Sequence, residues 1–248
     1  MWSLSLITAF LVLSGAVSPD PPAAQADEQP GRADLQPATT VARGPVVVTL
    51  GDSITRGVRS GVTAEQTFSA LLQRELRDDF PGLTVVNQGI GGERTDQALH
   101  RLEKDILSLR PDLVTVMYGT NDSYVDRGKT VSRLSEEQFE KNLRAIVSRL
   151  TMANVNVVVM TEPCWGNNAG KNGLGEHPDE RLRRYMQATR GVAESLQIPL
   201  VDHYRVWTKH RDAGNDPGDW TTDQCHPNPN GHRELARAML PVLKAGLE

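Results

Sequence analysis

Short apolar runs alternate with longer amphipathic stretches along most of this chain. The apolar runs are rich in β-branched residues and predict buried strands at 45–50, 83–87, 112–118, 155–161 and 198–202. The amphipathic stretches predict helices at 65–79, 94–109, 135–152, 178–196 and 230–246. Ser135 and Gln138 are spaced as a capping box at the start of the third of these helices.

Alternation of strands and helices is typical of a parallel sheet that helices cover on both faces. We therefore predict a three-layer α/β/α sandwich around a five-stranded parallel sheet, which is flavodoxin-like if its strand order is 2-1-3-4-5. About 200 residues suit one domain of this kind, so residues 45–248 are predicted to fold as a single unit.

The N-terminal part of the chain has a different pattern. Leu4 to Val17 is almost entirely apolar or small, which suits a signal peptide but is too short for a membrane-spanning helix. Ala24-Gln25-Ala26 offers a cleavage site, although no Lys or Arg precedes the apolar run. We predict a signal peptide at 1–26 and a disordered linker at 27–44. After cleavage the protein would be secreted or periplasmic, without an integral membrane segment. The alternative is an anchored or cytosolic N-terminus.

Composition narrows the range of partners. The chain has 248 residues, of which 38% are hydrophobic and 23% charged, as in ordinary soluble domains. A formal net charge of -4 argues against nucleic acid as the main partner. The two cysteines, Cys164 and Cys225, lack the spacing of a zinc or redox motif.

Four polar or glycine-rich segments follow predicted strands, namely Gly51-Asp52-Ser53, Asn87-Gln88-Gly89, Gly119-Thr120-Asn121 and Asp223-Gln224-Cys225-His226. The carboxyl ends of parallel strands meet at one edge of a sheet, where such folds bind ligands. That edge would hold a serine, a glycine N–H group, an asparagine amide and a histidine beside a carboxylate. These groups can serve acyl transfer as nucleophile, oxyanion donors, base and base-orienting acid.

These four segments, in this order, resemble the sequence blocks of the GDSL-type esterases, also called SGNH hydrolases. The resemblance extends from about residue 45 to the C-terminus and includes the residues 227–232 after the last block. Two departures occur: Ile54 stands where the family has leucine, and Cys225 lies between the acid and the base. Neither departure changes the chemistry that the blocks imply.

The resemblance implies a serine esterase with the SGNH hydrolase fold. Ser53 would be the nucleophile, His226 the base and Asp223 the acid that orients the base. The oxyanion hole would consist of the N–H groups of Ser53 and Gly89 and the Asn121 amide. Such an enzyme needs no metal or organic cofactor, and its substrates would be small acyl or acetyl esters of sugars or lipids.

Two other functions use the same sequence features. A secreted carbohydrate-binding protein on this fold could stack sugars on Trp165 and Trp220, with Trp207 near them, although tryptophans in loops also anchor loops to the core. An acyltransferase would use the catalytic residues of the esterase. The long loops 162–177 and 211–224 are expected to set substrate specificity, because they follow the fourth and fifth strands.

Other enzyme classes fit less well. An α/β-hydrolase needs G-x-S-x-G, and Thr55 occupies the position of the second glycine. The run Gly89-Ile90-Gly91-Gly92 matches neither a P-loop nor a dinucleotide-binding motif. A Cys225 nucleophile would compete with Ser53 for His226, and the histidines that could form a zinc site lack a ligand-spacing pattern: His203, His210, His226 and His232.

The cysteines give one further expectation. If the fourth and fifth strands are neighbours, Cys164 and Cys225 both lie at the catalytic edge of the sheet. In an oxidising compartment we expect them to form a disulfide, with two separate reduced thiols as the alternative.

Overall fold

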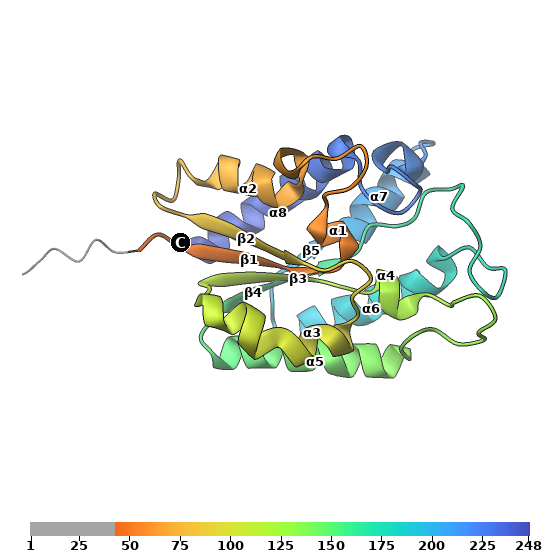
Figure 1. Ribbon diagram of the computed structural model, residues 1–248, viewed down its shortest axis with the longest axis horizontal. Coiled ribbons are helices and arrows are strands. Elements are labelled where there is room, and N and C mark those ends of the chain that lie inside the picture. Colours follow the sequence, from red (N-terminus) through yellow and green to blue (C-terminus); the bar gives the residue numbers. More distant parts are fainter. Residues whose placement is uncertain (1–42) are drawn as a thin grey trace, which may run out of the picture. The chain divides into compact units, whose positions relative to one another are not determined.

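The computed structural model describes residues 43–248, which form a parallel sheet between two layers of helices (Figure 1). The strand order is β2-β1-β3-β4-β5, and every neighbouring pair is parallel. The strands are β1 (Val46–Gly51), β2 (Thr84–Gly89), β3 (Leu113–Met117), β4 (Asn156–Thr161) and β5 (Leu200–Asp202). The predicted fold class and strand order are therefore confirmed.

Eight α-helices accompany the strands in the described residues. They are α1 (Ser53–Arg56), α2 (Phe68–Leu76), α3 (Thr95–Arg101), α4 (Thr120–Ser123), α5 (Glu136–Met152), α6 (Asp179–Ser195), α7 (His203–Asp212) and α8 (Pro229–Leu247). In Figure 1, α2, α7 and α8 lie above the sheet and α3, α5 and α6 lie below it. All residues of β3 are buried, because helices cover the central strands on both faces.

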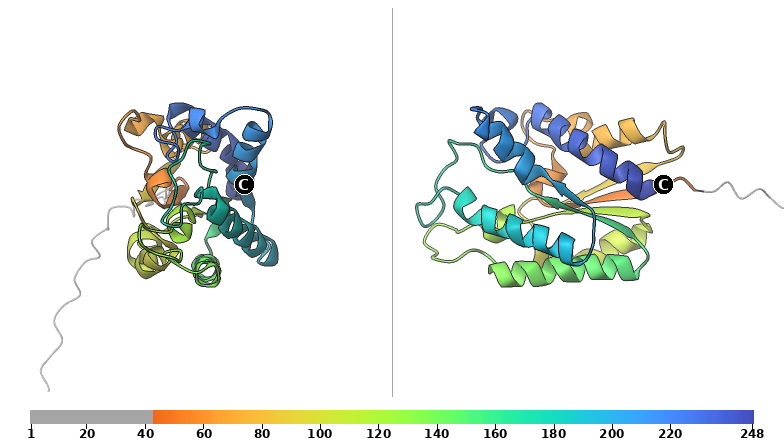
Figure 2. Two further views of the ribbon diagram at one scale, coloured as in Figure 1. Left: turned by 90° about the vertical axis from the view of Figure 1, so that its right-hand side faces the viewer. Right: turned by 180° about the vertical axis from the view of Figure 1, so that it is seen from behind.

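The edge that carries the candidate residues is well defined. The strands β1 and β3 each run directly into a one-turn helix, α1 and α4, at their carboxyl ends. In Figure 1 this edge is the right-hand end of the molecule, and it faces the viewer in the left view of Figure 2. The long loop after β4 and the turn before α8 reach the same end.

One predicted helix differs from the structure, and one helix of the structure was not predicted. The helix expected at 94–109 is α3 followed by a π-helical turn (Leu102–Ile106) and a 3-10 turn (Leu107–Leu109). Helix α7 was not predicted: Asp202 accepts a hydrogen bond from the Arg205 N–H at 3.1 Å and so caps it, and buried Tyr204 and Trp207 give it an apolar side. The second long loop therefore follows α7 and not β5 directly.

The predicted signal peptide and nearly all of the predicted linker lie in residues 1–42, outside the described part of the chain. Among residues 43–248, no helix is both long and apolar enough to cross a bilayer.

Candidate active site

The position of Ser53 follows from the end of strand β1. Gly51 is the last strand residue, and a Cβ there would lie 2.8 Å from the Met117 carbonyl oxygen on β3, so only glycine fits. Asp52 then caps α1, because its Oδ1 accepts a hydrogen bond from the Ile54 N–H at 2.8 Å. Ser53 is the first residue of this helix, with its hydroxyl at the carboxyl edge of the sheet.

The candidate base and the candidate acid, His226 and Asp223, lie in the turn before α8. Asp223 Oδ1 accepts hydrogen bonds from the backbone N–H of Cys225 at 3.2 Å and of His226 at 2.9 Å, which closes the turn. His226 Nδ1 lies 2.9 Å from Asp223 Oδ2, and His226 Nε2 lies 2.9 Å from Ser53 Oγ. The three predicted residues therefore form one continuous chain of hydrogen bonds, although 173 positions separate Ser53 from His226.

The charges around this chain favour a neutral histidine and an ionised aspartate. Burial lowers the pKa of His226, while the Asp223 carboxylate opposes this effect. Burial alone would raise the pKa of Asp223, but hydrogen bonds from His226 and the charges of His226 and Arg59 hold it below its usual range. Arg59 lies in the loop after α1, and its Nη2 is 2.6 Å from Asp223 Oδ2. An imidazole in this setting can accept a proton from Ser53 near neutral pH.

Arg59 gives a prediction on pH dependence. A general base works when it is neutral, so activity rises as pH increases through the pKa of His226. The positive charge of Arg59 lowers that pKa, together with burial and Arg56, against the opposing effect of Asp223. We expect Arg59→Gln to move the acid limb of the kcat/KM profile to higher pH. Arg59→Lys keeps the charge and should leave the limb close to its wild-type position.

A pH-rate profile of both variants shows whether Arg59 acts through its charge on the pKa of His226 or only by holding the turn in place. A reduced rate with an unmoved acid limb in Arg59→Gln would show that Arg59 only holds the turn in place.

Asn121 lies on α4, directly after the end of β3. Its Nδ2 donates to Asp52 Oδ2 at 2.7 Å, and its Oδ1 accepts a hydrogen bond from Arg133 Nη1 at 3.1 Å. Asp126 holds the Arg133 guanidinium through two contacts of 3.0 and 2.7 Å. An acceptor on the nitrogen side and a donor on the oxygen side fix the orientation of the amide, which leaves the second Nδ2 hydrogen for another acceptor.

A cavity of about 150 Å³ opens at these groups. It is lined by Ser53, Thr120, Asn121, Tyr124, Arg133, Trp165, Cys225 and His226. The rings of Tyr124 and Trp165 stack with centroids 6.1 Å apart and form an aromatic wall. A site of this size holds a small group, since pockets for drug-sized ligands are about 300–1,000 Å³.

The comparison with protein families decides the classification. A model of the GDSL-like lipase/acylhydrolase family matches residues 49–234, about three quarters of the chain. The chain belongs to this family. The resemblance seen in its four sequence blocks is thereby confirmed, and with it the assignment as an enzyme that hydrolyses ester bonds.

Individual members of the GDSL-like family are similar over most of the chain. The uncharacterized lipoprotein YqeF of Bacillus subtilis is 30% identical over 64% of this chain and 70% of its own length. An acetylxylan esterase of Geobacillus stearothermophilus is 27% identical over 81% of this chain and 94% of its own. The crystal structure of the acetyl xylan esterase AlAXEase superimposes with a TM-score of 0.67 at 26% identity, over 80% of this chain and 99% of that one.

Gly89, the predicted backbone donor, has other contacts in this structure. It ends β2, and its N–H donates to Asn87 Oδ1 at 2.9 Å. A Cβ at this position would lie 2.1 Å from the Arg56 nitrogen, so glycine allows α1 to pass closely over β2. Gly89 does not line the cavity at Ser53. Its role as an oxyanion donor stays a prediction, and it would require the N–H to leave Asn87.

The two long loops of this GDSL-like enzyme are joined next to the turn that carries Asp223 and His226. Gln224 has a left-handed backbone (φ 72°), and its carbonyl oxygen accepts a hydrogen bond from the Gly166 N–H at 2.8 Å. Its side-chain Oε1 accepts from the Asn168 N–H at 3.0 Å. The loop after β4, which brings Trp165 to the cavity, is thus attached to the turn that presents Asp223 and His226.

The tryptophans do not form one binding surface. Trp207 is fully buried, and Trp220 packs edge-on against it, with ring centroids 5.2 Å apart. His210 stacks on Trp220 at 3.8 Å between centroids. Of the three tryptophans considered in the sequence, only Trp165 lines the cavity at Ser53.

The expected disulfide is wrong, because Cys164 and Cys225 are both free and buried. Burial raises the pKa of Cys164 to about 12, and its charged neighbours include Asp179 and Arg211. Burial also raises the pKa of Cys225, whose charged neighbours are Asp52 and others at the catalytic edge. Neighbouring strands brought both cysteines to one end of the sheet, but their thiols face different surroundings.

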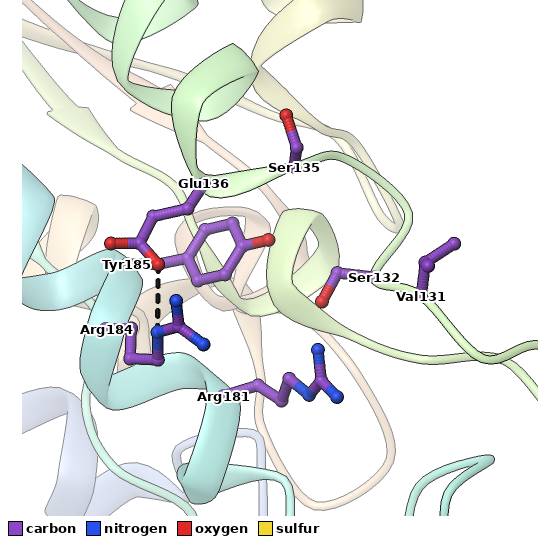
Figure 3. A pocket seen from close by; sticks show the side chains of 7 residues that line it. All are labelled: Val131, Ser132, Ser135, Glu136, Arg181, Arg184 and Tyr185. Atoms are coloured by element: carbon purple, nitrogen blue, oxygen red, sulfur yellow. Dashed lines mark ion pairs between the residues drawn. The ribbon is translucent and has the colours of Figure 1, made fainter.

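A larger cavity, of about 420 Å³, lies elsewhere between α5 and α6 and the segment before α5 (Figure 3). It is lined by Val131, Ser132, Ser135, Glu136, Arg181, Arg184 and Tyr185. Arg184 and Glu136 form an ion pair of 2.9 Å across it. Its lining includes serines but no histidine, and its one carboxylate, Glu136, is paired with Arg184.

Among residues 43–248, no three His, Cys, Asp or Glu side chains are grouped so that they could hold a metal ion. The four histidines considered as zinc ligands lie in different surroundings. His226 contacts Ser53, whereas His203 and His232 are fully buried, and burial lowers their pKa values to about 3 and about 4.

Sequence reasoning missed several residues that contact the candidate catalytic groups. Arg59 and Arg133 carry no motif, because isolated arginines in loops are usually solvated surface residues. Asp52 lies inside the first sequence block, so its position could have suggested a role. Glu162 directly follows β4, and an acid at that strand end was also a usable signal.

Proposed function

We propose that this GDSL-like enzyme is a serine esterase that works through an acyl-serine intermediate. The observation that carries the proposal is the hydrogen-bonded chain from Ser53 through His226 to Asp223. Ser53 Oγ attacks the ester carbonyl carbon while His226 Nε2 takes the hydroxyl proton. Asp223 accepts the Nδ1 proton in a hydrogen bond and stabilises the imidazolium that forms.

The oxyanion receives hydrogen bonds from the Ser53 N–H and from the free hydrogen of Asn121 Nδ2. Collapse of the tetrahedral intermediate breaks the bond to the alcohol oxygen, and His226 gives its proton to that oxygen. A water molecule then attacks the acyl-serine ester, with His226 again as base, and releases the acid and Ser53. Gly89 would add a third donor if its N–H exchanged Asn87 for the oxyanion.

We propose acetyl esters of carbohydrates as the substrate class. The small cavity at Ser53 suits a short acyl group, since its volume is about 150 Å³. The Tyr124–Trp165 wall beside it can pack against a sugar ring. Two relatives that match most of this chain are named as acetylxylan esterases, which supports the same class.

A substrate panel tests this proposal. We expect kcat/KM for nitrophenyl acetate to exceed that for nitrophenyl octanoate by about tenfold or more, because added methylenes do not fit. Acetylated xylo-oligosaccharides should be hydrolysed faster than lysophospholipids or acyl thioesters. Trp165→Ala should lower kcat/KM for the acetylated sugar more than for nitrophenyl acetate. A preference for the long acyl chain or for lysophospholipid would replace the sugar-ester proposal with a lipid substrate.

We also propose that the protein is exported. The apolar run from Leu4 to Val17 and the small residues around Ala26 support a cleaved signal peptide, and the similar YqeF is named a lipoprotein. The mass of the mature protein recovered from outside the cytoplasm should correspond to a chain that begins at Asp27. An uncleaved chain in the cytoplasm would contradict export.

A further inference from the structure

A third cavity, of about 430 Å³, lies on the other side of α1 from the one at Ser53. Its lining comes from α1, the loop after α1, α2 and the edge strand β2, and it includes Arg56 and Gly89 at the carboxyl edge of the sheet. Ser53 and Arg56 are the first and last residues of the one-turn helix α1, so their Cβ atoms are about 5–6 Å apart. A substrate whose ester group lies at Ser53 can therefore extend into this cavity.

Most polar side chains that line the cavity are hydrogen-bonded within the protein. Gln73 covers the outer edge of β2: its Nε2 donates to the Leu83 carbonyl oxygen at 2.9 Å, and its Oε1 accepts from the Val85 N–H at 2.6 Å. Three further polar side chains of the lining also have internal partners, namely Thr67, Ser69 and Asn87. These side chains shape the cavity and are already occupied.

Arg56 is the exception. Four other arginines around the carboxyl edge are each paired with an acid: Arg59 with Asp223, Arg94 with Asp96, Arg101 with Glu93 and Arg133 with Asp126. The Arg56 guanidinium has no ion pair or hydrogen bond within residues 43–248, and no acid of this part of the chain lines the cavity. The cavity therefore contains one cation whose charge is not compensated.

Gly91, in the loop after β2, forms the surface on which the Arg56 side chain lies. A Cβ at this position would be 3.0 Å from Arg56 Nη1 and 3.2 Å from Arg56 Cζ, so glycine lets the guanidinium lie close to the backbone. Val58, which is 46% exposed, adds an apolar contact in the same cavity. A guanidinium with free donors suits a carboxylate, which it can bind through two parallel hydrogen bonds.

We propose that Arg56 and this cavity bind a carboxylate of the substrate, so that the preferred esters are acetylated oligosaccharides that carry a uronic acid. The acetyl group would lie at Ser53, and the uronic acid would lie beside β2. The volume of about 430 Å³ is sufficient for a sugar ring, since pockets of about 300–1,000 Å³ hold drug-sized ligands. This inference rests on the proposed function, because it names a further feature of the same substrate.

The test compares two substrates that differ only in charge. One is an acetylated xylo-oligosaccharide with a glucuronic acid substituent, and the other is its uronamide, in which an uncharged amide replaces the carboxylate. We expect the wild-type kcat/KM to be about fivefold higher for the uronic acid, as for a partly exposed ion pair with good geometry. The assay is run at pH 8, because Arg56 also lowers the pKa of His226, and the ordinary value of about 6.5 lies well below that pH.

Substitution of Arg56 should change this preference without loss of the hydrolytic reaction. Arg56→Gln should remove the preference and alter kcat/KM for the uronamide by less than about twofold. Arg56→Glu should reverse the preference, because like charges then face each other. Arg149→Gln is the matched control, since Arg149 is an exposed arginine on α5 that does not line the cavity, and it should keep the wild-type preference.

Two results would overturn the proposal. One is an equal kcat/KM of the wild-type enzyme for the uronic acid and the uronamide. The other is a preference for the uronic acid that persists in Arg56→Gln, which would place the carboxylate at another cation.

A binding measurement separates this inference from the esterase mechanism. In calorimetric titrations with the deacetylated uronic acid and uronamide, the wild-type protein should bind the uronic acid with a Kd about fivefold lower, and Arg56→Gln should bind both equally. Equal binding by the wild-type protein would refute the carboxylate site even if the esters are hydrolysed. Retained hydrolysis by Ser53→Ala would refute the esterase mechanism and leave the difference in binding unchanged.

Discussion

Ser53→Ala is expected to reduce kcat for ester hydrolysis by about 10⁴- to 10⁶-fold, the range found when a triad nucleophile is removed. The substitution deletes the atom that would form the acyl bond, and burial raises the pKa of the nearby Cys225 thiol, which makes it a poor replacement. The Ser53 side chain makes one hydrogen bond, to His226 at 2.9 Å, so the free energy of unfolding should change by no more than about 1 kcal/mol. Steady-state kinetics and thermal unfolding measure the two quantities.

Ser148→Ala is a matched control, because Ser148 lies on α5 and does not line the cavity at Ser53. It should retain wild-type kcat. A purified, folded Ser53→Ala protein with more than a few per cent of wild-type turnover would show that Ser53 is not the nucleophile.

The second large effect concerns Asp223 and His226 as a pair. His226→Ala should lower kcat about as much as Ser53→Ala, and Asp223→Asn by about 10⁴-fold, because an asparagine favours the wrong tautomer of the imidazole. Asparagine is the better replacement for Asp223, since its Oδ1 can still accept the backbone N–H groups that close the turn. The double variant that combines Asp223→Asn with His226→Ala should be about as slow as His226→Ala alone.

Such a result is expected when residues act as one unit with the nucleophile. Losses that multiply in the double variant would show that Asp223 and His226 act separately. Far-ultraviolet circular dichroism of all three variants checks that the turn before α8 has not unfolded the domain.

The sequence by itself determined the architecture and which candidate catalytic groups lie together. Alternation of apolar runs and amphipathic stretches predicts a parallel sheet between helices, and the expected flavodoxin-like strand order agrees with the structure. Parallel strands end at one edge, so residues that follow strand ends, such as Ser53 and Asn121, must come close together. Asp223 and His226 lie three positions apart, and a single turn lets the carboxylate reach the imidazole.

Tertiary structure alone decided how those groups are held. Arg59 and Arg133 reach Asp223 and Asn121 across loops, and no spacing in the sequence encodes those distances. Cys164 and Cys225 are both free and buried, although both lie near the expected edge of the sheet. The Gly89 N–H donates to Asn87 Oδ1, a contact that no sequence pattern predicted.

The pKa shifts of the buried acids are the clearest case of this division. In the sequence, Asp52 and Glu162 are two ordinary acids that are 110 positions apart and ionised in water. Burial raises the pKa of Asp52 to about 7 and the pKa of Glu162 well above its usual range, and the charge of Asp52 adds to the effect on Glu162. Local sequence patterns set which residues end each strand, whereas desolvation and the direction of each donor exist only once the strands and loops have packed together.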